Sequence, residues 1–196
     1  FTKITLVRHG ESEGNVVGLR QSKPPGTPLT KKGIAQVQKS AKSLKKIHDN
    51  EPFDLIVSSP LLRAQQTAEI IASILCHVHG VEERCSERLE RPERAWCPAS
   101  VSEAGRARGA SLSAHRWGAR GERGALSSTP WYLEDTLISE IDFGNTEGKR
   151  DTEVKDYMAH RHELSSEIHY QEKSGETGES HHDVAKRALE FVKKMM

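Results

Sequence analysis

Residues 4–12 read ITLVRHGES, and this short stretch sets the expectation for the fold. Its apolar residues predict a short strand over 4–7 that ends at Arg8-His9-Gly10. In a parallel α/β sheet, ligand sites lie just beyond the carboxyl ends of the strands. A guanidinium and an imidazole at that place therefore predict a binding site, and Gly10 lets the backbone turn and approach a ligand closely.

A second strand is predicted at residues 53–57, FDLIV, because this continuous apolar run suits a fully buried strand. One helix is predicted before this strand, beginning after Thr30, with apolar residues three and four positions apart. Another is predicted after it, over residues 61–75. Strand, helix, strand and helix at this spacing indicate an α/β fold with a parallel sheet.

The composition limits the class of protein. With 196 residues, 35% hydrophobic and 29% charged, the chain suits a single domain spanning residues 1–196. A net charge of +1 provides no overall field, so we expect neither nucleic acid nor a membrane as a partner. Apolar runs are too short for a spanning helix, and the start, FTKITLVRHG, does not resemble a signal peptide. Three cysteines match no zinc or disulfide framework, so we expect a cytoplasmic location.

Residues 84–130 differ in composition from both flanks. They hold nine of the fifteen arginines, while no lysine occurs between Lys46 and Lys149. The stretch is dense in Gly, Ala and Ser and has no apolar period, so it cannot bury enough surface to offset ordering. We predict a disordered insertion that interrupts the domain. A cationic run can also bind nucleic acid, but this one lacks interleaved aromatic residues and a folded motif.

The remaining third of the chain is again regular. Residues 136–144 predict an extended edge that leads into a turn at Gly144, and residues 152–164 predict a helix. After Ser180, apolar residues at helical spacing predict a final helix that runs to the end of the chain.

Two strand ends thus deliver cationic side chains to one predicted rim. Arg8 and His9 follow the first strand, Arg63 opens the helix after the second, and the Asn15 amide can donate if its turn folds back. The planar guanidinium suits bidentate phosphate binding, and a helix N-terminus adds a favourable dipole. Each residue alone has an ordinary structural explanation, but together they predict a phosphoryl-binding site.

These motifs resemble the histidine phosphatase superfamily, which includes the cofactor-dependent phosphoglycerate mutases. The resemblance rests on LVRHGES at 6–12 with Asn15, and on SSPLLRAQQTA at 58–68. Softer matches follow in the family's order: Pro28-Leu29-Thr30, EIDFG at 140–144 with Glu147-Gly148, and Gly178-Glu179-Ser180 with Arg187. It implies a three-layer α/β/α sandwich with a mostly parallel sheet.

The resemblance also implies a two-step phosphoryl transfer. His9 attacks phosphorus and forms a phosphohistidine, while Arg8, Asn15 and Arg63 neutralise the oxygens without metal or cofactor. Glu140 protonates the leaving oxygen and later activates water; Glu90 is a weaker rival for that role because no Phe-Gly turn follows it. We expect a phosphatase acting on a small phosphomonoester. The alternatives are mutase-type transfer and a non-catalytic phosphoryl-binding or scaffold protein.

The chain departs from the family pattern at its end. The family has a second histidine in an apolar strand after its last helix, and we expect this residue to lie beyond Met196. His79-Gly80 has the His-Gly dipeptide of that strand, but it lies before the segment that supplies the proton donor. We therefore reject His79 as the second histidine. Without that donor we expect the 196-residue chain to be a poor enzyme. The pairs His160/His162 and His181/His182 lack convincing metal-ligand spacing.

Overall fold

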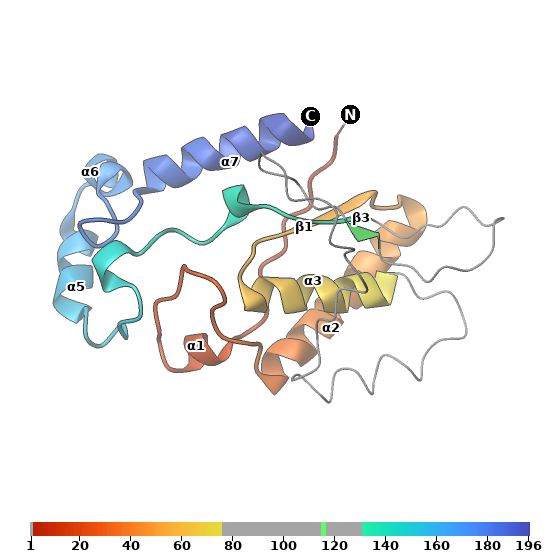
Figure 1. The fold of residues 1–196 in the computed structure, drawn as a ribbon, viewed down its shortest axis with the longest axis horizontal. Helices are drawn as coiled ribbons and strands as arrows, with labels where there is room; N and C mark the ends of the chain where they lie inside the picture. The colour runs from red at the N-terminus through yellow and green to blue at the C-terminus, as the bar shows by residue number, and fades with distance from the viewer. Residues whose placement is uncertain (1, 76–114, 117–130) are drawn as a thin grey trace, which may run out of the picture.

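The structure, a computed structural model, describes residues 2–75, 115–116 and 131–196. Its helices and strands follow the chain in the order shown in Figure 1. They are α1 (Glu13–Val16), α2 (Lys31–Asn50), β1 (Leu55–Ser58), α3 (Leu62–Leu75), β2 (His115–Arg116), β3 (Trp131–Glu134), η2 (Thr136–Ile138), η3 (Gly144–Thr146), α5 (Lys155–Glu163), α6 (Ser166–Gln171) and α7 (His181–Met195).

A small sheet lies between two groups of helices. Its strand order is β1-β3-β2, in which β1 and β3 are parallel and β2 is antiparallel to β3. The register pairs Leu55 with Trp131 and Ser58 with Glu134. Figure 1 shows α2 and α3 on one side of the strands and α7 on the other. The predicted α/β class is therefore confirmed.

The main helices form where the sequence predicts them, because their start signals are present. The Thr30 hydroxyl caps α2 by accepting a hydrogen bond from the Gly33 amide at 2.9 Å. Ser180 and Asp183 form a capping box at the start of α7. The helix predicted over 152–164 is shorter and is observed as α5. No helix in the described ranges is both long and apolar enough to cross a membrane.

The predicted first strand is wrong. Residues 2–9 form no strand, and Leu6 is 89% exposed. An apolar pattern reports the propensity for a strand, whereas a strand also needs a hydrogen-bonded neighbour. In the described residues β1 pairs only with β3, so this segment has no such partner.

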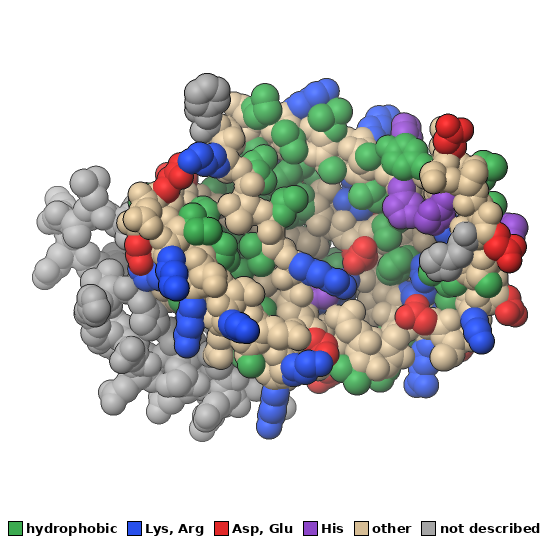
Figure 2. All heavy atoms as spheres, turned by 180° about the vertical axis from the view of Figure 1, so that it is seen from behind, with side chains coloured by type: hydrophobic (Ala, Val, Ile, Leu, Met, Phe, Trp, Pro, Cys, Tyr) green, Lys and Arg blue, Asp and Glu red, His purple; other side chains and the backbone are tan. Residues whose placement is uncertain are grey.

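Figure 2 shows hydrophobic side chains gathered over the upper part of one face of the molecule.

Two further predictions need correction. The strand predicted at residues 53–57 is observed as β1 at residues 55–58. It is not fully buried, because it lies at the edge of the described sheet, where Leu55 is 38% exposed. Residues 136–144 are not a continuous extended edge, because the Asp135 carboxylate caps the short helix η2. The predicted turn at Gly144 is present, with a φ of +55° that favours glycine.

Most of the predicted insertion at 84–130 lies outside the described residues. The exception is β2, which pairs with β3. His79 and Glu90 also lie outside the described ranges. The insertion and its disorder therefore stay predictions.

The hydrophobic core of the described part lies mainly between α2 and α3. Its buried members come from both helices and from the loop that precedes α2: Leu29, Val37, Ala41, Ile70, Ile71 and Leu75. The partly buried Phe53 and Ile56 pack against this cluster from the β1 side. This packing fixes the position of α2 and of its first turn. The segment that follows His9 packs against that turn.

Two glycines allow that close packing. A Cβ at Gly33 would collide with the backbone carbonyl of Glu11, and a Cβ at Gly10 would lie 2.5 Å from the Gly33 carbonyl oxygen. Because the colliding atoms are backbone, they cannot move aside as a flexible side chain would. The two chain segments can therefore touch only while both positions lack a side chain.

We predict that Gly33→Ala destabilises the protein, although Gly→Ala inside a helix normally stabilises it. The collision with Glu11 should lower the free energy of unfolding by on the order of 1–3 kcal/mol, as for overpacking. Urea denaturation measures this change. Ser40→Ala, at an exposed position of the same helix, is the control and should stay within about 0.5 kcal/mol of the parent. A Gly33→Ala variant as stable as the parent would contradict the close approach.

Candidate phosphoryl-transfer site

His9 is positioned by the residue that follows it rather than by a strand. The Gly10 amide donates to the Thr67 hydroxyl on α3 at 3.3 Å. One residue later, the Glu11 carbonyl accepts a hydrogen bond from the Thr30 amide at 2.9 Å. These contacts anchor the backbone to α3 and to the start of α2, and they leave the His9 imidazole half-buried.

The two ring nitrogens of His9 have different partners. Nδ1 lies 2.7 Å from the Gly10 carbonyl oxygen, which can only accept, so Nδ1 carries the hydrogen. Nε2 accepts a hydrogen bond from Nε of Arg63 at 3.2 Å. Both contacts assign the same neutral tautomer, in which Nε2 holds the free electron pair that a nucleophile needs.

The pKa of His9 lies below its ordinary value of 6.5. Burial is the largest cause, since it disfavours the charged imidazolium. The positive charges of Arg63 and Arg8 act in the same direction, while the hydrogen bond to Gly10 and the charge of Glu140 oppose it. The fold therefore favours the neutral imidazole of His9 over the imidazolium.

Arg63 lies at the start of α3 and is only 5% exposed. Its Nη2 donates to the Gln21 carbonyl at 2.9 Å and lies 3.7 Å from Oε2 of Glu140. Burial lowers the pKa of Arg63, and the charges of Glu140 and Glu147 oppose that shift. The guanidinium of Arg63 thus contacts an imidazole, a loop carbonyl and a carboxylate, which come from three other segments of the chain.

Glu140 reaches this guanidinium from the segment between β3 and η3. Its side chain is 39% exposed, so one side of the carboxylate faces Arg63 while water can reach the other. Its Oε1 also accepts a hydrogen bond from the Ile141 amide at 3.1 Å. The structure therefore brings together three of the five predicted residues: His9, Arg63 and Glu140.

Arg8 and Asn15 are placed differently from these three. Arg8 is exposed and influences His9 through its charge. Asn15 occupies the third position of α1, and its Oδ1 accepts hydrogen bonds from the amide and hydroxyl of Ser12, both at 3.0 Å. The Asn15 oxygen thus serves a capping box, a role that the prediction of a phosphate contact did not include.

Sequence reasoning missed three supporting residues. Glu147 holds the 22–23 loop by accepting from the Ser22 amide and hydroxyl and from the Lys23 amide. Thr67 bridges the Gly10 amide and the Arg63 carbonyl. Gln21 contributes only its carbonyl, which carries no sequence signal. Thr67 was detectable, because it lies four residues after Arg63 and so faces the same side of α3.

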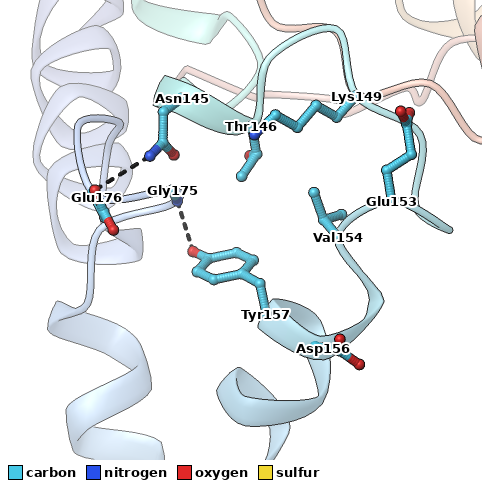
Figure 3. A pocket seen from close by; sticks show the side chains of 9 residues that line it. All are labelled: Asn145, Thr146, Lys149, Glu153, Val154, Asp156, Tyr157, Gly175 and Glu176. Carbon is cyan, nitrogen blue, oxygen red and sulfur yellow. Dashed lines mark hydrogen bonds between the residues drawn. The ribbon is translucent and has the colours of Figure 1, made fainter.

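A separate cavity of about 230 Å³ lies beside α5 and η3 (Figure 3). It is lined by Asn145, Thr146, Lys149, Glu153, Val154, Asp156, Tyr157, Gly175 and Glu176. In Figure 3 the Tyr157 hydroxyl points to the Gly175 amide, which donates to it at 2.6 Å. His9, Arg63 and Glu140 do not line this cavity, so it is not part of the site around the imidazole.

Metal ligands do not gather in the part of the chain that the structure describes. No group of three or more His, Cys, Asp or Glu side chains there could hold an ion. The positive charge beside His9 comes instead from guanidinium groups. The described α/β fold and this arrangement define a histidine-centred site suited to a phosphoryl group.

The comparison with known families agrees with that class. The sequence profile of the histidine phosphatase superfamily (branch 1) matches residues 4–122 and 118–196. The chain therefore belongs to the histidine phosphatase superfamily.

Curated relatives match about a third to two fifths of the chain. The adenosylcobalamin/alpha-ribazole phosphatase of Salmonella typhimurium is 46% identical over 69 residues, which are 35% of this chain and 32% of that protein. A 2,3-bisphosphoglycerate-dependent phosphoglycerate mutase of Protochlamydia amoebophila is 39% identical over 80 residues, 41% of this chain and 32% of that protein. The matched stretch thus spans about a third of the length of either relative.

Solved structures support the fold. The alpha-ribazole phosphatase of Shigella flexneri superposes with a TM-score of 0.53 at 21% identity, covering 96% of this chain and 64% of that one. A mycobacterial glucosyl-3-phosphoglycerate phosphatase complexed with VO3 gives a TM-score of 0.53 at 20% identity, with the same two coverages. The predicted phosphoglycerate mutase-like α/β fold is confirmed.

We predict that the His9 imidazole titrates below 6.5 and that Arg63→Met raises its pKa, because removing a nearby positive charge favours the imidazolium. Arg8→Met should raise the pKa less, and Lys23→Met, a charge that does not act on His9, should leave it unchanged. NMR titration of the imidazole protons, assigned with a His9→Ala variant, measures these values. An unchanged or lower pKa in Arg63→Met would contradict the electrostatic assignment.

The same shift affects stability. Because the folded-state pKa is lowered, the unfolded chain binds more protons between the two pKa values. The contribution of His9 to the free energy of unfolding is therefore full above 6.5 and is lost as the pH falls through the folded-state value.

Proposed function

We propose that this chain is the catalytic part of a cytoplasmic, metal-independent phosphatase that hydrolyses a small phosphomonoester through a phosphohistidine on His9. The observation that carries the proposal is the neutral Nε2 of His9, which lies 3.2 Å from Nε of the buried Arg63. Glu140 approaches the same guanidinium at 3.7 Å. A nucleophile, an anion-binding cation and a proton carrier thus lie within one cluster.

In the first step the lone pair on Nε2 of His9 forms a bond to phosphorus while the bond from phosphorus to the ester oxygen breaks. The leaving oxygen keeps that electron pair and takes the proton of the Glu140 carboxyl group. Arg63 and Arg8 neutralise the negative charge on the remaining phosphoryl oxygens, and the Asn15 amide nitrogen is available for a further hydrogen bond. The Nδ1–H bond to Gly10 keeps the ring oriented while positive charge develops on it.

In the second step the Glu140 carboxylate takes a proton from water, whose oxygen bonds to phosphorus as the bond to Nε2 breaks. This step releases inorganic phosphate and restores neutral His9. The partly exposed side of Glu140 favours hydrolysis, because water can reach this carboxylate. Mutase-type transfer is the second candidate, favoured by the mutase among the matching relatives, and a mutase must exclude that water.

A non-catalytic phosphoryl-binding protein is the remaining alternative. It would use the same Arg63 and His9 contacts but would not transfer the phosphoryl group. Turnover of a generic aryl phosphate, measured beside vanadate binding, separates the two functions. Vanadate binding with no turnover and no covalent label would favour the binding protein.

We predict that brief exposure to a ³²P-labelled phosphoryl donor, followed by denaturation, leaves label that is acid-labile and alkali-stable, as a phosphorus–nitrogen bond requires. His9→Ala should abolish the label, because the attacking nitrogen is removed. His160→Ala, an exposed histidine on α5, is the matched control and should retain it. Label that survives in the His9→Ala protein would refute the assignment.

We also predict that a chelator leaves both labelling and turnover unchanged, since guanidinium groups supply the charge that a metal ion supplies in other phosphatases. The measurement compares initial rates with and without chelator and after adding a divalent ion. Loss of activity with the chelator and its return with the ion would show that Arg63 and Arg8 do not suffice.

A further inference from the structure

Arg187 on α7 binds the backbone of the segment that carries Glu140. Nη1 of Arg187 donates to the Leu137 carbonyl at 2.8 Å, and Nη2 donates to the Glu140 carbonyl at 3.2 Å. The guanidinium therefore spans the backbone on both sides of Ser139. These bonds act on the backbone of Glu140, while its carboxylate extends toward Arg63.

Glu179 fixes the direction of that guanidinium. Its Oε1 accepts from Nε of Arg187 at 2.9 Å and its Oε2 accepts from Nη2 at 3.0 Å, which makes the pair bidentate. The same Oε2 accepts from the Asp142 amide at 3.0 Å, and the Glu179 amide donates to the Asp142 carbonyl at 3.0 Å. One ion pair thus holds the backbone before, at and after Glu140.

The start of α7 fixes the positions of Glu179 and Arg187. Glu179 immediately precedes the capping box of Ser180 and Asp183, and Arg187 follows two turns later on the same helix. Near its other end, Lys194 pairs with Asp135 at 2.7 Å. The segment 135–142 is therefore bound by α7 at Asp135, Leu137 and Glu140, and at Asp142 by Glu179, just before the helix.

We propose that Arg187 and Glu179 are positioning residues for Glu140 and set how well it delivers its proton to the leaving oxygen; this inference rests on the proposed function. Within the described part of the chain, neither residue forms a hydrogen bond or ion pair with His9 or Arg63. Their effect passes through the backbone of Glu140. A displacement of that backbone by about 1 Å is enough to weaken a proton transfer strongly.

A pair of substrates that differ in leaving group tests this role. An alkyl phosphate releases a basic alkoxide and needs a proton from Glu140, whereas 2,4-dinitrophenyl phosphate releases a stable phenolate and does not. With Arg187→Met, kcat/KM should fall about 100-fold for the alkyl ester and less than about 3-fold for the dinitrophenyl ester, as loss of general acid catalysis requires. Lys186→Met, at the neighbouring exposed position, should change neither rate.

Glu179→Gln provides a second variant that preserves the size and the acceptor oxygen of the side chain. It should show the same selectivity with a smaller loss, because one neutral hydrogen bond to Arg187 remains. The retained dinitrophenyl activity serves as the internal control for folding. An equal loss on both esters, or no loss on either, in both variants would overturn the positioning role. Turnover of neither ester by the parent, together with no phosphoryl label on His9, would defeat the proposed function itself, and the inference with it.

Discussion

The guanidinium of Arg63 is almost fully buried, and a buried charge is tolerated only where its donors find acceptors. Its acceptors here are Nε2 of His9 and the Gln21 carbonyl, with the Glu140 carboxylate at 3.7 Å. These groups come from segments that are distant in sequence, so satisfying one arginine fixes their relative positions. Truncating Arg63 would leave the imidazole, the loop and the carboxylate without their common neighbour.

Arg63 can occupy that place because the backbones around it pack without side chains between them. Gly10 and Gly33 allow the segment after His9 to touch the first turn of α2. Thr67, one turn beyond Arg63 on α3, then binds the Gly10 amide. The core between α2 and α3 thereby orients the imidazole of His9 and the guanidinium of Arg63 together, although no strand leads into His9.

The helices α2, α3 and α7 were predictable from the sequence, as was the proximity of His9 and Arg63, because both have local signals. Thr30 and Ser180 are hydroxyl caps placed before apolar periodicity, and the motifs around His9 and Arg63 are short and contiguous. The first strand failed as a prediction because pairing depends on a neighbour that no local pattern specifies. The contacts of Arg63 with the Gln21 carbonyl and of Arg187 with the Glu140 carbonyl were equally impossible to predict from the sequence. Every residue has a backbone acceptor, and only the fold selects among them.

The hydrogen bond from Arg63 to Nε2 of His9 gives the proposed mechanism a link between substrate binding and activation. While Nε of Arg63 donates to Nε2, it occupies the electron pair that, in this mechanism, attacks phosphorus. A phosphoryl oxygen carries more negative charge than a neutral imidazole nitrogen, so it is the stronger acceptor for the same guanidinium. As the phosphoryl group arrives, Arg63 can transfer its hydrogen bond from the nucleophile to the substrate. In the proposed mechanism, the step that neutralises the phosphoryl oxygens then also frees the nitrogen that attacks, and the lowered pKa of His9 disfavours protonation of this nitrogen in its place.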